Sequence, residues 1–267
     1  MWLYVIIFLM LSGLLYMSFE ARWLEVKRIF FSKKADSLKV LHLSDIHIHR
    51  LEVDYKKIKS AIDSENPDII IMSGDYIEKP GHVEKFLEFL DYIRGTHKIY
   101  FCFGNHDYEA FEKNDKLLEE FAERIEKRGI EILHNRSACI EKNSKKYNII
   151  GIADIRYSHH DIGQALEDRC IDAVANIAFS HNPDVVLEIP EGKVDYLFCG
   201  HFHGGQIWAP FDLEFKLLRD EKLCKLGIKR GLHKINGMNL YISKGLGNVC
   251  FPLRFMSRPE ITVFYMP

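Results

Sequence analysis

Five short blocks of polar residues, far apart in the sequence, carry side chains that bind divalent metals. They are Asp45-Ile46-His47, Gly74-Asp75, Gly104-Asn105-His106-Asp107, Ser180-His181 and Gly200-His201-Phe202-His203. Carboxylates, an amide oxygen and imidazoles suit Mn²⁺, Fe or Zn²⁺ rather than Cu(I) or an iron–sulfur cluster. A carboxylate can bridge two metals about 3.5–4 Å apart, as in many phosphatases. The blocks therefore predict a two-metal site for phosphoryl transfer.

Taken singly, most of these blocks have a simpler explanation. Gly-Asp is an ordinary turn dipeptide, and Asp-x-His or Gly-Asn-His-Asp could be loop residues. The block at Ser180 could start a helix, with Asn182 as the N-cap and Pro183 at the first helical position. Strand alternation puts both imidazoles of Gly-His-x-His on one side, so this block is the most informative. The prediction depends on all five blocks together.

Short apolar runs of the length of buried strands precede the blocks, and periodic segments between them are typical of helices. Strands that alternate with helices predict an α/β fold whose strand-end loops gather at one edge of a sheet. A polar turn at 143–146 predicts a hairpin. Gly74 and Gly104 are expected at turns that need a positive φ. The strand runs are 39–43, 68–72, 99–103, 177–179 and 196–199, and the helical segments are 55–65, 83–94 and 115–127.

The order DxH, GD, GNHD, SH and GHxH resembles the calcineurin-like metallophosphoesterase family, from about Leu38 to the C-terminus. The longer block 200–206, GHFHGGQ, with SKGLG at 243–247, is similar to a membrane-anchored bacterial subgroup. That subgroup includes phosphodiesterases linked to UDP-2,3-diacylglucosamine hydrolysis in lipid A synthesis. The resemblance implies an α/β fold: a four-layer αββα sandwich of two mixed sheets flanked by helices, preceded by one N-terminal transmembrane helix.

The resemblance also implies a role for each polar residue of the blocks. His106 would act as general acid or phosphate contact, and Asp107 would orient its imidazole. A hydroxide that bridges the metals would attack phosphorus in line. Phe202 stands where many relatives carry a small or hydroxylated residue, which bears on packing or substrate fit. Two divalent metal ions would be held by seven ligands: Asp45, His47 and His203 on the first ion, Asn105, His181 and His201 on the second, and Asp75 on both.

The remaining histidines are expected to lie outside the site. His42 alternates away from the site within its strand and is expected in the core. The others are expected in loops or on the surface: His49, His82, His97, His134, His159, His160 and His233.

The N-terminus carries an uncharged run at 2–19, eighteen residues long. This is near the lower limit for a transmembrane helix, about 17–25 residues. A signal peptide would need a basic start and a small-residue cleavage site, and this chain has neither. A buried helix of the catalytic domain is a third explanation. We expect a membrane anchor at 1–20, a basic juxtamembrane linker at 21–37 and a metallophosphoesterase catalytic domain at 38–267.

The charges that follow the anchor predict its orientation. Five basic residues at 22–34 outnumber the acidic Glu20 and Glu25, so positive-inside bias puts the catalytic domain in the cytoplasm. Cys102 and Cys199 fall in predicted buried strands, and no Cys spacing resembles a disulfide framework. Reduced thiols fit a cytosolic compartment. The net charge of −2 gives no sign of a nucleic-acid partner, and no obligate protein partner is inferred.

Together these features predict a membrane-anchored two-metal phosphohydrolase that cleaves a phosphodiester or pyrophosphate bond. Its substrate would be lipid-linked, such as UDP-2,3-diacylglucosamine. The alternative is a metallophosphatase with a soluble or protein substrate, anchored only for location. A non-catalytic scaffold would have lost ligands, and here all seven ligands and His106 are present. The apolar and basic segment 211–234 could contact lipid at the mouth of the site, or be an ordinary amphipathic loop.

Overall fold

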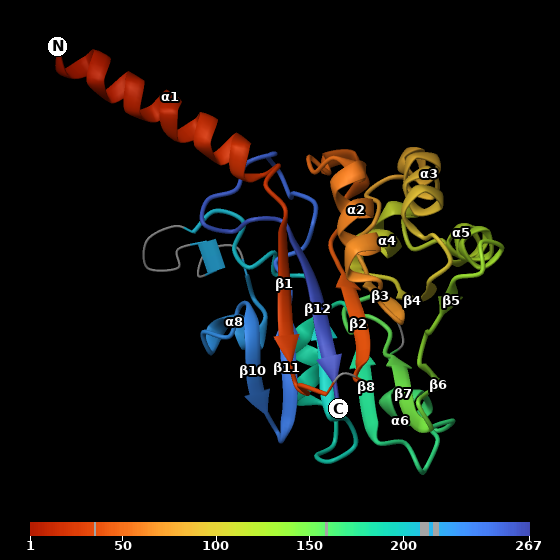
Figure 1. The fold of residues 1–267 in the computed structure, drawn as a ribbon. Helices are drawn as coiled ribbons and strands as arrows, with labels where there is room; N and C mark the ends of the chain where they lie inside the picture. Colours follow the sequence, from red (N-terminus) through yellow and green to blue (C-terminus); the bar gives the residue numbers. More distant parts are fainter. Residues whose placement is uncertain (35, 158–159, 209–213, 216–218) are drawn as a thin grey trace.

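Two six-stranded sheets form the centre of the computed structural model, which describes residues 1–34, 36–157, 160–208, 214–215 and 219–267 (Figure 1). The first sheet has the order β1-β12-β2-β3-β4-β5, and the second has the order β10-β11-β9-β8-β7-β6. The strands of the first are β1 (Glu25–Phe30), β2 (Leu38–Leu43), β3 (Ile69–Ser73), β4 (Lys98–Cys102), β5 (Glu131–Ile132) and β12 (Glu260–Met266). Those of the second are β6 (Arg136–Lys142), β7 (Lys145–Gly151), β8 (Ala175–Phe179), β9 (Tyr196–Cys199), β10 (Gly231–Ile235) and β11 (Met238–Ile242).

Both sheets are mixed, with a parallel centre. Strands β2 to β5 run parallel, and β12 is antiparallel to β2. Strands β7, β8, β9 and β11 run parallel, while β6 and β10 pair antiparallel at the edges. Strands β6 and β7 form the predicted hairpin. Parallel strands need cover on both faces, so each sheet requires a layer of helices as well as its partner sheet.

Helices supply that cover. Buried side chains of α2, α3, α4 and α5 pack on the first sheet, and those of α6, α8 and the 3₁₀ helix η3 pack on the second. The predicted helices at 55–65, 83–94 and 115–127 are present within one residue. The helical elements are α2 (Tyr55–Glu65), α3 (Val83–Ile93), α4 (Asn105–Ala110), α5 (Asp115–Glu126), α6 (Ile162–Ala165), α8 (Lys222–Lys225), η1 (Ile48–Arg50), η2 (Pro80–His82) and η3 (Pro183–Leu187).

A third core lies between the sheets and joins them. Val40 and Ile71 of the first sheet are fully buried there, together with Ile177 and Phe198 of the second. The rings of Phe198 and Phe264 stack with centroids 3.9 Å apart. Each such side chain contributes about 1.5–3 kcal/mol by leaving water. The three cores confirm the predicted four-layer αββα sandwich of two mixed sheets with flanking helices.

The segment predicted as a linker contains a strand of the first sheet. Strand β1 pairs in parallel with β12, from Glu25 opposite Glu260 to Phe30 opposite Tyr265. Lys244 pairs with the carboxylates of both Glu25 and Glu260. The sheet therefore begins at Glu25 rather than at Leu38. Charged residues are common on edge strands, and the Lys and Arg within β1 concealed its alternation.

The N-terminal helix α1 (Trp2–Glu20) projects from the sandwich and touches it only through its last turns (Figure 1). By length and composition it could cross a membrane, and none of its apolar span is buried. Its end is docked, because Glu20 is buried and accepts a hydrogen bond from the Ser257 N–H at 2.8 Å. The carbonyl of Met17 accepts a second one from the Arg254 N–H at 3.1 Å.

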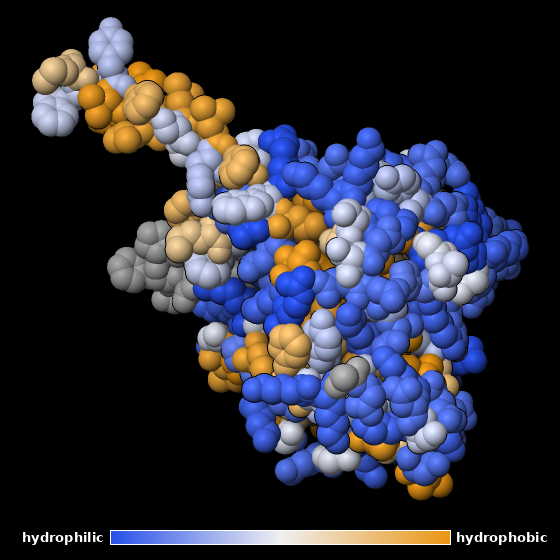
Figure 2. All heavy atoms as spheres, in the orientation of Figure 1, coloured by the Kyte–Doolittle hydropathy of each residue, from blue (hydrophilic) through white to orange (hydrophobic). Residues whose placement is uncertain are grey.

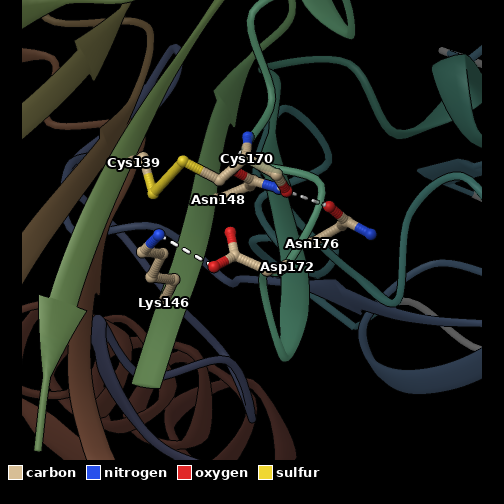
Figure 3. The surroundings of a disulfide bond; sticks show 6 residues. All are labelled: Cys139, Lys146, Asn148, Cys170, Asp172 and Asn176. Carbon is tan, nitrogen blue, oxygen red and sulfur yellow. Dashed lines mark hydrogen bonds and ion pairs between the residues drawn. A yellow bond between two sulfur atoms is a disulfide. The ribbon is translucent and has the colours of Figure 1, made fainter. Parts of the chain in front are cut away.

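The far end of the second sheet holds a disulfide between Cys139 and Cys170 (Figure 3). Cys139 lies opposite Asn148 in the β6–β7 register, and Asn148 exchanges two hydrogen bonds with the backbone of Cys170, at 2.9 and 3.0 Å. One side chain of β7 thus brings together two cysteines that are 31 residues apart. The expectation of reduced thiols was wrong for this pair, because the spacing gave no sign of it. Cys102 and Cys199 are free and buried, as expected.

Candidate metal centre

The polar blocks meet at the carboxyl ends of the parallel strands. Asp45 and His47 follow β2, Asp75 follows β3, and Asn105 opens α4 just after β4. From the second sheet, His181 follows β8, and His201 and His203 follow β9. All seven side chains are buried. Such crevices at strand ends are where α/β sheets bind ligands.

Six of these residues form two groups of convergent donor atoms. Asp45, His47 and His203 make the first, and Asp75, His181 and His201 make the second, with the ligand atoms of each group within 4.8 Å of one another. In the first group His203 Nε2 lies 3.2 Å from His47 Nε2 and 3.3 Å from Asp45 Oδ1. In the second, His201 Nδ1 lies 3.1 Å from His181 Nε2.

Asp75, a member of the second group, also lies close to the first. Its Oδ2 is 3.0 Å from His181 Nε2 and 3.7 Å from His47 Nε2. Its Oδ1 accepts a hydrogen bond from the His106 N–H at 2.9 Å. One carboxylate thus reaches imidazoles of both groups, which is the position that a bridging ligand requires.

The donor set fits two divalent metals. Within the part of the chain that the structure describes, the buried Oδ1 of Asn105 has no hydrogen-bond partner. Such an atom is costly unless a ligand satisfies it. Two pairs of imidazole nitrogens also face each other at 3.1–3.2 Å. Nitrogen and oxygen donors with no thiolate match the predicted class of metals.

The backbone at the site is held in an unusual conformation. Left-handed φ costs a residue other than Gly about 1–3 kcal/mol and concentrates at functional sites. Gly74 has the predicted positive φ of +94°, whereas Gly104 has a φ of −104°. Gly104 is required for space, because a Cβ there would lie 2.3 Å from Asp75 Oδ1. Five of the seven proposed ligands are left-handed: Asp45 (50°), His47 (38°), Asp75 (61°), His201 (71°) and His203 (51°).

Comparison with known proteins identifies the family. Residues 38–205 match the family of calcineurin-like phosphoesterases. The chain belongs to this family. It is 31% identical over 228 residues to the uncharacterized metallophosphoesterase YkoQ of Bacillus subtilis (strain 168), covering 84% of this chain and 82% of YkoQ. The predicted metal-dependent phosphoric ester hydrolase class is confirmed.

Two further relatives carry functional names. The metallophosphoesterase is 28% identical over 263 residues to phosphodiesterase YaeI of Escherichia coli (strain K12), covering 94% of this chain and 92% of YaeI. It is 27% identical to UDP-2,3-diacylglucosamine pyrophosphatase LpxG of Chlamydia trachomatis, covering 84% and 82%. Among solved structures, phosphopantetheinyl hydrolase PptH from Mycobacterium tuberculosis shares the fold, with a TM-score of 0.52, 10% identity and coverage of 83% and 96%.

The histidines of the metallophosphoesterase site have pKa values shifted in opposite directions. Burial lowers the pKa of His181, but the Asp75 carboxylate beside it more than offsets burial and raises that pKa to about 10. Burial lowers the pKa of His201 to about 3. Burial and the neighbouring His47 hold the pKa of His203 well below its usual range. The lowered pKa values keep His201 and His203 neutral, which is the form of imidazole that binds metals.

Three groups behind the ligands fix their imidazoles. The Ser73 carbonyl lies 2.8 Å from His181 Nδ1. Glu78 Oε1 lies 3.2 Å from His47 Nδ1, and Glu221 Oε1 lies 2.9 Å from His201 Nε2. Such partners orient metal-binding imidazoles. Neither glutamate was predicted from the sequence. Glu78 lies three residues after Asp75, which is a local signal, whereas nothing local marks Glu221.

His106 and Asp107 take different places. His106 lines the cavity over the site, and its Nδ1 lies 3.0 Å from the carboxylate of Glu109. Asp107 is fully buried and accepts hydrogen bonds from four backbone N–H groups, those of Gly104 and residues 75–77. It therefore shapes the Asp75 turn, and Glu109 takes the orienting position that we had expected for Asp107.

The other histidines lie mostly where expected. His42 is buried against Ser73, with Nε2 2.7 Å from Oγ. His49 is closer to the site than expected, since it stacks on His82 and lies 3.1 Å from Glu78. His97 and His160 contact Pro67 and Glu188 in loops, and His233 lies on the edge strand β10 and contacts the Arg230 carbonyl. His134 is exposed beside Tyr108, and His159 lies outside the described residues.

A cavity of about 740 Å³ opens over the metal ligands. Its lining includes Arg156 and Arg219, which lie 3.6 and 3.7 Å from Glu221 Oε1, and the apolar residues Ile207, Val249 and Phe251. Of the segment 211–234, residues 211–213 and 216–218 lie outside the described residues. Phe202 is fully buried in the second core, so its effect is on packing. Asn182 and Pro183 do start the helix η3, next to His181.

Proposed function

We propose that this metallophosphoesterase is a membrane-anchored two-metal phosphohydrolase that cleaves a phosphodiester or pyrophosphate bond in a lipid-linked substrate. One observation carries the proposal. The cavity is lined both by polar residues at the metal site, Asp75, Asn105 and His203, and by the apolar residues Val249 and Phe251. A molecule with a phosphate and an acyl chain would satisfy both surfaces.

The proposed ligands are those predicted from the five blocks. When bound, two divalent ions would supply Lewis-acid chemistry, which lowers the pKa of water and neutralises charge on phosphoryl oxygens. Arg156 and Arg219 offer guanidinium groups that suit a second phosphate or a phosphate oxygen. His106 lies at the cavity with Nδ1 held by Glu109, so Nε2 is the nitrogen that would deliver a proton to the leaving oxygen.

The anchor would be α1, and the name of the relative LpxG supports a nucleotide-linked diacyl sugar as the substrate class. For orientation, basic residues after α1 favour a cytoplasmic catalytic domain. The Cys139–Cys170 disulfide is of the kind that persists in oxidising compartments. A Glu141→Cys variant treated with an impermeant maleimide tests the orientation. We expect no labelling in intact cells, and labelling there would place the domain outside.

The substrate proposal is tested with full-length protein in detergent and defined Mn²⁺. UDP-2,3-diacylglucosamine is compared with UDP-N-acetylglucosamine, which has the same pyrophosphate and no long acyl chains. We expect kcat/KM for the acylated compound to be at least about a hundredfold higher, since each buried methylene contributes about 0.8 kcal/mol. Equal values would favour the alternative, a metallophosphatase with a soluble substrate. Loss of both activities in His106→Ala identifies the metal site as their source.

A further inference from the structure

We propose that the catalytic domain itself rests on the lipid bilayer through the loop 249–256, so that the cavity over the metal site opens at the membrane surface. This loop is called the rim loop below. The inference rests on the proposed function, because a cavity that opens there matters only for a substrate held in the membrane.

The rim loop exposes large apolar side chains. Phe251 is 66% exposed, Met256 is 57% exposed and Phe255 is 37% exposed. Trp23, just beyond α1, is 46% exposed. Figure 2 shows apolar surface directly beneath the end of α1. Exposed apolar groups gathered in one place on a soluble domain mark an interaction surface rather than ordinary exposure.

The position of the rim loop next to α1 indicates that the loop contacts lipid. Phe255 packs edge-on against Tyr16 of α1, with ring centroids 6.1 Å apart. The Arg254 N–H donates to Met17, and the Ser257 N–H donates to Glu20. Glu20 is the first charged side chain of α1, so a helix that spans a bilayer would leave its apolar layer near this turn. The rim loop is bonded to the same turn and therefore lies at the depth of the bilayer surface.

Residues typical of a membrane interface surround this turn. The guanidinium of Arg258 lies 3.9 Å from the ring centroid of Trp23 and donates to the Trp23 carbonyl at 3.0 Å. Arg22 lies two residues after the end of α1 and pairs with Glu52 at 2.6 Å. Trp at the level of the headgroups and Arg toward lipid phosphates are favoured positions. This chemistry favours lipid over a second protein.

The rim loop is also a wall of the cavity. Val249, Cys250 and Phe251 line it beside the ligands His201 and His203. Gln206 holds the loop in place, because its Nε2 donates to the carbonyls of Phe251 and Leu253 at 2.7 and 2.8 Å, and its Oε1 accepts from the Val249 N–H at 2.6 Å. An acyl chain could pass along this wall while the phosphates reach the metals.

The chain carries its own probe for the test. Cys250 is exposed, whereas the free thiols of Cys102, Cys199 and Cys224 are buried. Full-length protein is labelled at Cys250 with a polarity-sensitive fluorophore and placed in nanodiscs of phosphatidylethanolamine and phosphatidylglycerol. We expect the emission of the dye to be shifted to the blue relative to the same dye in water. We also expect its fluorescence to be quenched strongly by lipids with nitroxide on the acyl chain and only weakly by iodide. The matched control carries the dye at Glu141→Cys in a Cys250→Ser background, on the remote β6–β7 hairpin.

Quenching of the Cys250 probe by iodide, as strong as that of the Glu141→Cys probe, would overturn the proposal. A blue shift without quenching by nitroxide lipids would also overturn it, because the loop would then be covered by protein. Neither outcome depends on the substrate, so failure of the proposed function stays distinguishable.

A second measurement links the surface to turnover. Met256 lies in the rim loop but is not among the residues that line the cavity. Met256→Glu should therefore raise KM for a lipid-linked diphosphate presented in vesicles at least about tenfold. Hydrolysis of a water-soluble diester should be unchanged. Leu117→Glu on α5, also an exposed apolar position, should change neither value. Equal losses on both substrates by Met256→Glu would indicate a folding effect and contradict a lipid contact.

Discussion

The two groups of proposed metal ligands are supported by different parts of the molecule. The first, with Asp45, His47 and His203, is supported by the glycine-rich loop 243–248 and, through this loop, by the end of α1. The second, with His181 and His201, is supported by contacts with the Ser73 carbonyl and with Glu221. One half of the site is therefore connected to the N-terminal helix α1, whereas the other half is held within the sandwich.

The link from the first group to α1 passes through Arg254. A Cβ at Gly245 would lie 2.6 Å from the Cβ of Asp45, and the Gly247 N–H donates to the Asp45 carbonyl at 2.7 Å. The fully buried Arg254 guanidinium holds this loop by donating to the carbonyls of Lys244, Gly245, Gly247 and Ser257 and to Asn248 Oδ1. The backbone N–H of Arg254 meanwhile donates to Met17 of α1.

The largest effect is expected where the two groups meet. Asp75→Ala removes the carboxylate that reaches imidazoles of both groups, so neither ion would keep its full ligand set. We expect kcat/KM for a model diester to fall by at least about a thousandfold. Metal content measured by mass spectrometry should fall below two ions per chain. Full activity in purified, folded Asp75→Ala would rule out the two-metal mechanism.

The next effect should be confined to the first group. Arg254→Met leaves several buried carbonyls without a donor, which should lower the free energy of unfolding by about 3–4 kcal/mol. In the protein that remains folded, anomalous scattering should show weaker occupancy at the first group than at the second. Arg124→Met is the matched control. Arg124 is partly exposed, and its guanidinium pairs with Glu84 at the surface, so its loss should cost less than about 1 kcal/mol. Equal loss of both ions would contradict the division of the site.

A matched pair of glutamates compares the two halves directly. Glu221→Gln should weaken metal binding at the second group about 10–100-fold, and Glu78→Gln should do the same at the first, since each removes a carboxylate that orients an imidazole. Chelator competition followed by metal analysis measures both. If the two variants release the same ion, the assignment of separate supports is wrong.

The sequence predicts the ligands of this site but not the residues that support them. The ligand blocks were found because each lies directly after an apolar run, so local pattern and strand topology together place them at one edge. Glu221 and Arg254 could not be found in this way, because their partners lie across the fold and no spacing marks them. Strand β1 was missed because its charges concealed an edge strand. Asp107 was placed near the right residues but with the wrong partner, since adjacency to His106 does not tell where a carboxylate points.

The smallest effect on the site is expected from its most remote support. The Cys139–Cys170 disulfide lies at the opposite end of the second sheet from the metal ligands, and it closes a loop of 31 residues. In the chain-entropy account, removing it by Cys139→Ser with Cys170→Ser lowers the free energy of unfolding of the oxidised protein by about 3–4 kcal/mol. Because β7 keeps its pairing with β8 without the bond, the ligand His181 should stay in place. Thermal denaturation should therefore shift while metal content and diester hydrolysis stay unchanged. A loss of metal from the second group in this variant would mean that the sandwich transmits strain along its whole length, and that the half connected to α1 is not the only one with a distant support.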